Sequence, residues 1–250
     1  MTNPDRPRVT LKLATSLDGR IATGSGESRW ITGEAAREQV HRLRAQHQMI
    51  LVGIGTALAD DPELTVRLPG YVGEQPARVV LDSRQRLPVT SKLVQTAHRI
   101  PTIVVAATPA REDLLEHGVV VIAPEGITTE RLEPEEIMEV LPASQEEVAA
   151  QLEALAESGV VQMEDVEHAI RVGEPFSLMI EGGGQVAASF LKAGLVDAIE
   201  WFRAPIVLGD EGRPAVGAME INALGDAPRF RRVAVEELGP DLWERYERVA

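Results

Sequence analysis

The run Glu181-Gly182-Gly183-Gly184 is the segment of this sequence best suited to bind an anion. It lies between an apolar stretch and a stretch of helix-forming residues, and such a junction exposes backbone N–H groups at a helix N-terminus, where the helix dipole stabilises negative charge. Gly182, Gly184 and Ala187 also satisfy a G-x-G-x-x-A pattern, so a Rossmann dehydrogenase is a rival interpretation. A Rossmann domain normally opens with this pattern, whereas only about 70 of the 250 residues follow it here. The remaining alternative is a tight turn without a ligand.

A second pair of glycines, Gly53 and Gly55, follows another apolar stretch but lacks the third glycine of a dinucleotide fingerprint. Thr56 has a hydroxyl that could bind a phosphate or a ribose. The adjacent carboxylates Asp60 and Asp61 could transfer protons if one of them were buried. The alternative is that the two carboxylates only form a turn.

Two arginines, Arg44 and Arg67, could hold a phosphate through their planar forks. Arg44 lies near the end of an expected helix, so it could instead only stabilise the helix C-terminus. Residues 82–84, Asp-Ser-Arg, directly follow an expected strand. Ligands bind at the carboxyl ends of strands in open α/β sheets, although a surface turn explains these residues equally well.

The N-terminal region contains a turn signal, Asp18-Gly19, and a glycine-rich stretch at 24–30. This stretch is either a hinge or a loop that folds over a ligand. In the second case Ser28 supplies a hydroxyl and Trp30 a flat apolar wall.

The sequence has no cysteine, which excludes disulfides, thiolate metal sites and a cysteine nucleophile. The five histidines lack the spacing of metal ligands, so we expect no metal site. No apolar run is long enough for a membrane span and no signal peptide is recognisable, so we expect a cytoplasmic protein that binds no membrane.

The net charge of -14 belongs to one part of the chain. Residues 111–174 contain 17 acidic residues and three arginines, while the remaining residues contain 22 acidic and 22 basic residues. Nucleic-acid binding requires a basic face, so this balance argues against it. We expect the acidic stretch to be a solvated surface.

Hydrophobic patterning predicts an α/β protein with a mainly parallel sheet. The expected strands are 9–14, 49–54, 77–82, 102–106, 119–123, 176–180 and 198–202, with an antiparallel hairpin of 230–238 and 242–249. Helices are expected at 33–47 and 185–193. Residues 128–172, which lie within the acidic stretch, are also expected to be helical. We predict one domain over 1–250 with an acidic insertion at about 107–175.

Taken in order, five segments resemble the riboflavin-biosynthesis pyrimidine reductases: K-L-A-T-S-L-D-G-R from Lys12, G-E-S-R-W-I-T from Gly26, L-A-D-D-P-x-L-T-V-R from Leu58, Asp82-Ser83, and Glu181-Gly182-Gly183-Gly184. Members of this family reduce 5-amino-6-(5-phosphoribosylamino)uracil with NADPH. The resemblance implies a fold similar to dihydrofolate reductase, with a central, mostly parallel sheet flanked by helices and a C-terminal antiparallel hairpin. It also implies a homodimer.

The resemblance assigns roles to individual positions. The implied substrate-binding residues are Ser28, Arg44, Leu64, Arg67 and Glu181, with the two arginines facing the ribose phosphate. The implied NADPH-contacting residues are Ala14, Trp30, Thr56, Asp60, Ser83 and the stretch Gly183, Gly184, Gln185, Val186, Ala187, Ala188 and Ser189. Asp60 is also our candidate for the catalytic polar group near the ribose ring oxygen. Glu63 departs from the expected pattern because it adds an acid beside the phosphate-facing region.

In many bacteria this reductase is fused behind a zinc-dependent deaminase that requires cysteine ligands. We expect this cysteine-free chain to be the reductase alone. Two alternatives stay open: a related NADPH-dependent reductase of another heterocycle, such as a pterin, and a non-catalytic nucleotide-binding module whose acidic segment binds a partner.

Overall fold

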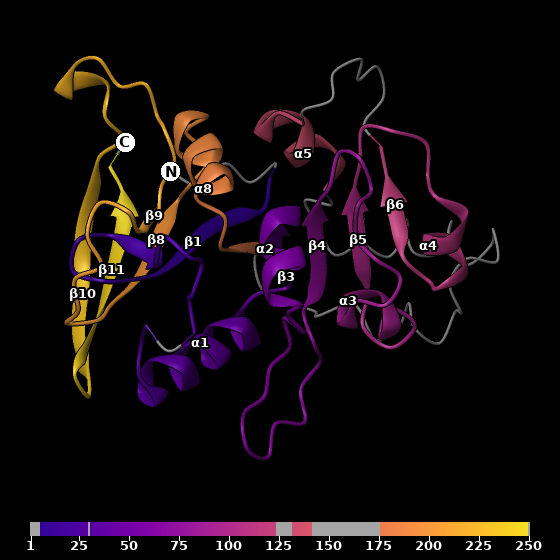
Figure 1. The fold of residues 1–250 in the computed structure, drawn as a ribbon, viewed down its shortest axis with the longest axis horizontal. Coiled ribbons are helices and arrows are strands. Elements are labelled where there is room, and N and C mark those ends of the chain that lie inside the picture. The colour runs from indigo at the N-terminus through magenta and orange to yellow at the C-terminus, as the bar shows by residue number, and fades with distance from the viewer. Residues whose placement is uncertain (1–5, 30, 124–131, 142–175, 250) are drawn as a thin grey trace. The chain divides into compact units, whose positions relative to one another are not determined.

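A computed structural model describes residues 6–29, 31–123, 132–141 and 176–249, and the chain divides into two compact units (Figure 1). The first unit comprises Val9–Leu43 and Met179–Ala250, and the second comprises Arg44–Leu178 with Asn3–Arg8. Much of the expected acidic insertion lies outside the described residues, and a single domain stays a prediction.

Five strands lie side by side in the first unit. Their bounds are Arg8–Thr15 (β1), Ser177–Glu181 (β7), Ala198–Arg203 (β8), Phe230–Leu238 (β10) and Asp241–Arg248 (β11). The order is β10-β11-β8-β1-β7, with β1 parallel to β8 and the β10–β11 hairpin antiparallel to β8. The three strands and the C-terminal hairpin predicted for this region are confirmed.

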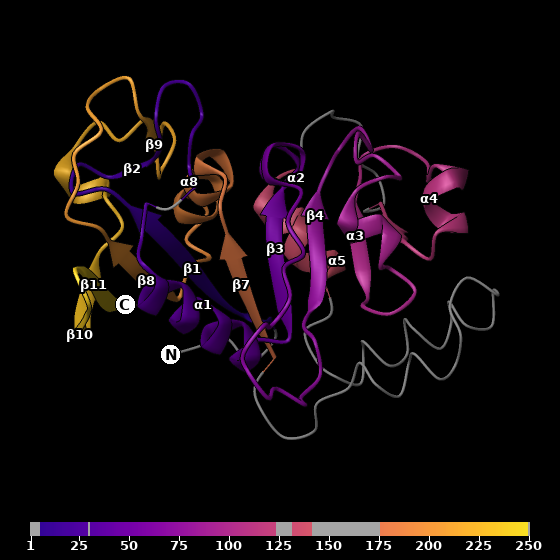
Figure 2. The ribbon, with the colours of Figure 1, turned by 60° about the horizontal axis from the view of Figure 1, so that its bottom comes forward.

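Two helices cover opposite faces of these strands (Figures 1 and 2). The first, α1 (Glu34–Gln46), buries Ala36, Val40 and Leu43, and the second, α8 (Gly184–Lys192), buries a stripe that includes Phe190. Apolar residues three and four positions apart form one face of a helix, which explains why these segments pack as helices. Both helices were predicted.

Four parallel strands form the sheet of the second unit, in chain order: β3 (Met49–Gly53), β4 (Ala77–Leu81), β5 (Thr102–Val105) and β6 (Val120–Ile122). All five residues of β3 are buried, as expected for parallel strands covered on both faces. The four strands predicted here are confirmed, so the mainly parallel α/β class with an antiparallel C-terminal hairpin is confirmed as well. Since the strands are parallel, their carboxyl ends lie at one edge (Figure 2).

Short elements complete the described chain. The helices of the second unit are α2 (Ile54–Asp60), α3 (Lys92–Gln95), α4 (Glu112–Glu116) and α5 (Pro134–Val140). The first unit adds a two-stranded ribbon of β2 (Arg20–Ala22) and β9 (Arg213–Pro214), and a 3-10 turn, η1 (Leu224–Asp226). Within the described residues, no helix is both long and apolar enough to cross a bilayer.

Arg78, in the middle of the second unit, is fully buried. Its guanidinium donates to Thr102 Oγ1 at 2.6 Å, Thr96 Oγ1 at 2.7 Å and the Ile100 carbonyl at 2.8 Å. Burial lowers the pKa of Arg78 to about 10, so the group still carries its charge at neutral pH. A buried charge is tolerated only when hydrogen bonds replace its hydration. Arg78 therefore ties β4 to the segment that leads into β5.

Replacing this arginine should destabilise the protein. We expect Arg78→Ala to lower the free energy of unfolding by about 3 kcal/mol, because it leaves buried carbonyl groups unpaired and opens a cavity. Arg99→Ala is the control, since Arg99 is an exposed cation whose charge lowers the pKa of Arg78. Urea unfolding followed by circular dichroism measures both, and equal stabilities for the two variants would contradict the role of Arg78.

Candidate functional site

The N-terminal motif forms the end of β1 and the turn after it. Ala14 is half-buried in β1, and Ser16 at the turn is buried. Ser28 is half-buried in the glycine-containing loop that follows β2. Trp30, predicted to contact the cofactor, lies outside the described residues. The described part of this region thus offers the Ser28 hydroxyl and the backbone of β1 to a ligand.

The triple-glycine run lies between β7 and α8, as predicted. Gly182 and Gly183 have φ angles of 90° and 89°, which only glycine adopts without strain. Of the residues predicted to contact the cofactor, Gln185 is exposed, whereas Ala187 and Ala188 are buried in the α8 core face. A ligand at this helix terminus would therefore meet backbone N–H groups rather than the two alanine side chains.

The remaining predicted residues of the first unit flank this run. Glu181, the last residue of β7, is buried, so its carboxylate is largely withdrawn from water. Val186 and Ser189 are half-buried, and the Ser189 hydroxyl donates to the Gln185 carbonyl at 3.0 Å. The Ser189 side chain therefore bonds to a main-chain carbonyl one turn earlier within α8.

The second glycine pair leads from β3 directly into α2, a helix that we did not predict. Thr56 is half-buried in its first turn and Asp60 is its last residue. Asp61 has a left-handed φ of 39° and accepts a hydrogen bond from the Lys92 backbone N–H at 2.9 Å. Asp61 therefore has a structural role, and the exposed Asp60 is the carboxylate that a ligand can reach. Neither aspartate is buried, and burial of one of them was our condition for acid/base work by this pair.

The two predicted phosphate-binding arginines meet at one residue of the second unit, Thr65. Arg44 donates to the Thr65 carbonyl at 2.9 Å, and Arg67 donates to the Thr65 hydroxyl at 3.2 Å. Arg67 also forms an ion pair with Glu63 at 3.1 Å, and both side chains are about half exposed. The two guanidinium groups contact different atoms of the half-buried Thr65, and an oxyanion that reaches both can form several charge-assisted hydrogen bonds. Glu63 competes with such an anion for Arg67.

The segment that carries these groups has an irregular backbone that buried side chains support. Leu64 is buried and has a left-handed φ of 54°, an unusual conformation for a leucine. The Gln75 side chain accepts from the Val66 N–H at 2.7 Å and donates to the Val66 carbonyl at 3.2 Å. Strained backbone of this kind persists where its surroundings hold it, and it concentrates at functional sites.

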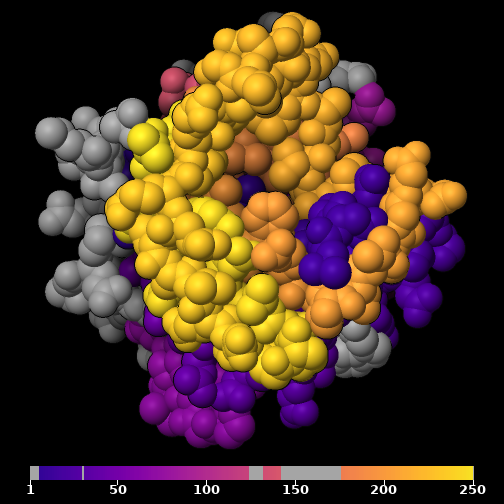
Figure 3. Space-filling view, turned by 90° about the vertical axis from the view of Figure 1, so that its left-hand side faces the viewer, coloured from indigo at the N-terminus to yellow at the C-terminus, as the bar shows by residue number. Residues whose placement is uncertain are grey.

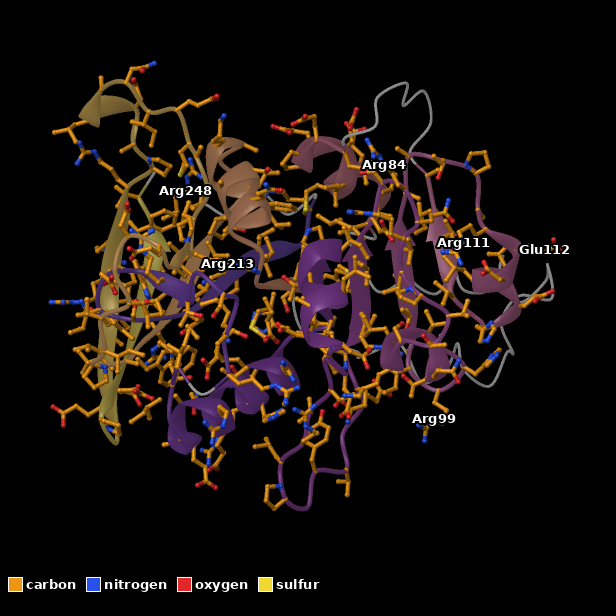
Figure 4. The ribbon with its side chains drawn as sticks, viewed as in Figure 1. Arg84, Arg99, Arg111, Glu112, Arg213 and Arg248 are labelled. Atoms are coloured by element: carbon orange, nitrogen blue, oxygen red, sulfur yellow. The ribbon has the colours of Figure 1, made fainter. Side chains whose placement is uncertain are left out.

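A hollow of about 160 Å³ lies at the carboxyl end of β4, lined by Ile54, Leu81, Ser83, Arg84 and Arg86. Arg84 is labelled in Figure 4 at the opposite end of β4 and β5 from Arg99. The lining combines two guanidinium groups, a hydroxyl and two apolar side chains. This combination suits a ligand that has both a ring and an anionic group.

The loop that forms this hollow is rigidly held. Asp82 is fully buried, and its Oδ2 accepts from the Leu87 N–H at 2.8 Å. Its Oδ1 has no hydrogen-bond partner among the described residues and lies 3.6 Å from Nε of Arg86. The Gln85 side chain donates to Thr108 Oγ1 at 2.7 Å. Asp82 and Gln85 therefore shape the loop, and Ser83 and Arg84 face the hollow.

Sequence reasoning missed Arg86 and the supporting roles of Asp18, Gln75 and Arg78. Arg86 lies only two positions after the Asp-Ser-Arg run, so extending that motif would have included it. The supporting residues form contacts between distant segments, which spacing does not reveal. Among the described residues, no group of three or more His, Asp or Glu side chains is placed to hold a metal ion.

Comparison with known proteins shows the family to which the chain belongs. A family model described as the RibD C-terminal domain matches residues 7–243. The riboflavin biosynthesis protein RibD of Bacillus amyloliquefaciens is 35% identical over 241 residues, which cover 94% of this chain and 56% of that protein. The chain thus spans a little over half the length of this curated relative.

Solved structures of similar proteins have the same fold. Acinetobacter baumannii RibD has a TM-score of 0.73 at 30% identity, over 98% of this chain and 58% of that one. A Thermotoga maritima protein named as a diaminohydroxyphosphoribosylaminopyrimidine deaminase/5-amino-6-(5-phosphoribosylamino)uracil reductase has a TM-score of 0.69 at 26% identity, over 98% of this chain and 57% of that one.

The ion pair between Arg67 and Glu63 can be tested by mutation. Glu63→Gln should raise the affinity for ribose 5-phosphate about two- to fivefold, because an exposed ion pair is worth only about 0.2–1 kcal/mol. Glu38→Gln is the matched control, since Glu38 pairs with Arg42 at the same i,i+4 spacing away from this segment. Isothermal titration calorimetry measures both. Weaker binding by Glu63→Gln would show that Glu63 supports the anion site rather than competing with it.

Proposed function

Because this chain belongs to the family of the RibD C-terminal domain, we propose that it is a pyrimidine reductase of riboflavin biosynthesis. It reduces the ribosyl group of 5-amino-6-(5-phosphoribosylamino)uracil to the ribitylamino product with NADPH, as a cytoplasmic homodimer. The single observation in favour of a phosphorylated substrate is the meeting of Arg44 and Arg67 at Thr65.

The proposed substrate contacts are the five positions of the family pattern: Ser28, Arg44, Leu64, Arg67 and Glu181. The two arginines bind the ribose phosphate, a dianion that can displace Glu63 from Arg67. Leu64 is buried, so its backbone rather than its side chain faces the substrate. Ser28 and the buried carboxylate of Glu181 hydrogen-bond to polar groups of the pyrimidine or the sugar.

The proposed cofactor contacts are Ala14, Trp30, Thr56, Asp60, Ser83 and the residues 183–189. The hollow beside Ser83 fits the adenosine end of NADPH, because Arg84 and Arg86 supply cations for its 2′-phosphate. The N–H groups at the start of α8 fit the diphosphate. Each of these two groups of residues by itself suits an anionic part of a phosphorylated dinucleotide.

The reaction assigns limited tasks to the protein. When bound, NADPH supplies the hydride that reduces C1′ of the ribosyl group after its ring has opened to an imine. Arg44 and Arg67 fix the far end of the ribosyl chain and so orient C1′. Asp60, exposed at the end of α2, is the proposed polar group near the ring oxygen.

An activity assay tests the proposal directly. The purified chain should consume NADPH on addition of 5-amino-6-(5-phosphoribosylamino)uracil, followed at the NADPH absorbance, and should not consume it with dihydrofolate. We expect Arg67→Ala to raise KM for the pyrimidine roughly 10- to 100-fold, because it removes a charge-assisted hydrogen bond to the phosphate. Arg42→Ala, from the exposed side of α1, should leave KM unchanged. The proposal fails if the wild-type chain consumes no NADPH with the pyrimidine.

Cofactor preference tests the hollow at β4. Arg84→Ala should raise KM for NADPH about tenfold and leave KM for NADH nearly unchanged, because only NADPH carries the 2′-phosphate. Arg99→Ala, at the other end of the strands, is the control (Figure 4). An equal rise in KM for both dinucleotides would indicate that the hollow binds a part of the cofactor other than the 2′-phosphate.

A further inference from the structure

One segment of the first unit, residues 206–217, contacts every described site motif of that unit. We call it the bridging segment. At its start, the Leu17 N–H donates to the Ile206 carbonyl at 2.7 Å. Further along, Arg20 donates to the Gly212 carbonyl at 3.2 Å. In Figure 3, indigo atoms of the N-terminal region are bordered by orange atoms from the later part of the chain.

The loop that carries Ser28 also lies against the bridging segment. A Cβ atom added to Gly24 would lie 3.0 Å from the Glu211 carbonyl oxygen, and one added to Gly26 would lie 2.8 Å from the Arg213 guanidinium. The contact at Gly24 is with a main-chain oxygen, whereas the contact at Gly26 is with the end of a long side chain. The backbone at Gly24 therefore lies directly against Glu211, and the Arg213 side chain lies against Gly26.

The triple-glycine run rests on the other end of the bridging segment. The Gly217 N–H donates to the Gly184 carbonyl at 2.7 Å. A Cβ atom added to Gly184 would lie 2.6 Å from the Pro214 carbonyl oxygen. The bridging segment thus fixes the N-terminus of α8 and the Ser28 loop relative to each other.

Asp18 anchors the start of the bridging segment. Its carboxylate accepts hydrogen bonds from the N–H groups of Leu208 at 3.1 Å and Gly209 at 2.8 Å. The hydroxyl of the buried Ser16 donates to the same carboxylate at 2.6 Å. These hydrogen bonds, that from Ser16 first, lower the pKa of Asp18 to about 2, so the carboxylate is ionised at any working pH. Hydrogen bonds to an ionised group are about twice as strong as neutral ones.

We propose that Asp18 is a positioning residue of the reductase, which holds the bridging segment so that the Ser28 loop and the N-terminus of α8 keep the spacing required to bind substrate and cofactor. The inference rests on the proposed function, since that function makes the α8 terminus a cofactor site. Asp18 itself touches neither reactant. Its effect reaches the cofactor through Leu208, Gly209 and the Gly217–Gly184 hydrogen bond.

Asp18→Asn is the first test. An asparagine removes the charge, and its NH2 group replaces one of the two oxygens that accept from Leu208 and Gly209, so one of these N–H groups faces another donor. The start of the bridging segment therefore loses part of its anchor. We expect the dissociation constant of NADPH, measured by fluorescence titration, to rise about tenfold. Asp210→Asn is the matched control, because Asp210 lies in the same segment but is fully exposed, and within the described part of the chain its carboxylate forms an ion pair with Arg20 at 3.3 Å. Its NADPH affinity should equal that of the wild type.

A purely structural role for Asp18 predicts a different result. In that case Asp18→Asn lowers the melting temperature and the active fraction, while the folded molecules bind NADPH with unchanged affinity. Unchanged affinity in the folded variant, or an equal loss in Asp210→Asn, would overturn the proposal.

Gly217→Ala tests the same coupling without altering Asp18. Its Cβ would lie 3.1 Å from the Gly184 carbonyl oxygen, so the start of α8 must shift. We expect weaker NADPH binding here too, whereas Gly225→Ala should have no effect because nothing lies within 4 Å of its Cβ. Wild-type affinity in Gly217→Ala overturns the inference even if Asp18→Asn does not fold. A wild-type chain that binds NADPH without reducing the pyrimidine would refute the proposed function and leave the inference standing.

Discussion

Buried main-chain groups need hydrogen-bond partners, and this requirement governs the irregular segments of both units. Parallel strands are joined by long connections rather than tight turns, so much of the chain at the strand ends lacks regular partners. Side chains supply them. Arg78 binds the Ile100 carbonyl, and Gln75 binds both polar groups of Val66. At the surface, Asp18 binds the N–H groups of Leu208 and Gly209 in the same way. Segments held in this way can keep an unusual backbone conformation, such as the left-handed Leu64.

Neighbouring residues of the same motif have different roles, one in supporting the backbone and one in facing solvent or a ligand. Asp61 caps the start of α3, while Asp60 beside it is exposed. Asp82 closes its loop on Leu87, while Ser83 lines the hollow. In each pair the hydrogen bonds of one polar residue hold the backbone in place, and its neighbour in the sequence is available to a ligand. A carboxylate in a motif is therefore not by itself evidence of acid/base chemistry, because its hydrogen bonds decide which of the two roles it has.

The segment around Thr65, which we propose binds the substrate phosphate, shows how charge is balanced without a ligand. Arg44 and Arg67 contact Thr65 through different atoms, one through its carbonyl and the other through its hydroxyl. Glu63 neutralises part of the charge on Arg67 at the surface. A dianion that binds two guanidinium groups is held more strongly than the single Glu63 carboxylate, which binds one. The ion pair between Glu63 and Arg67 can therefore be replaced by a ligand with a small loss of free energy.

The sequence by itself determined all the described strands except β2 and β9, the helices α1 and α8, and the glycine run between β7 and α8. These features depend on local periodicity and on the conformational freedom of glycine, and both can be recognised from a short stretch of consecutive residues. The local pattern made Arg44, Arg67 and Ser83 candidates for ligand binding, and the family resemblance assigned their roles, but neither indicated helix α2, the hollow with Arg86 or the bridging segment. Only the tertiary structure decided these, because hydrogen bonds such as that between Gly217 and Gly184 join residues 33 positions apart. Nothing in the local pattern of either segment specifies that partner.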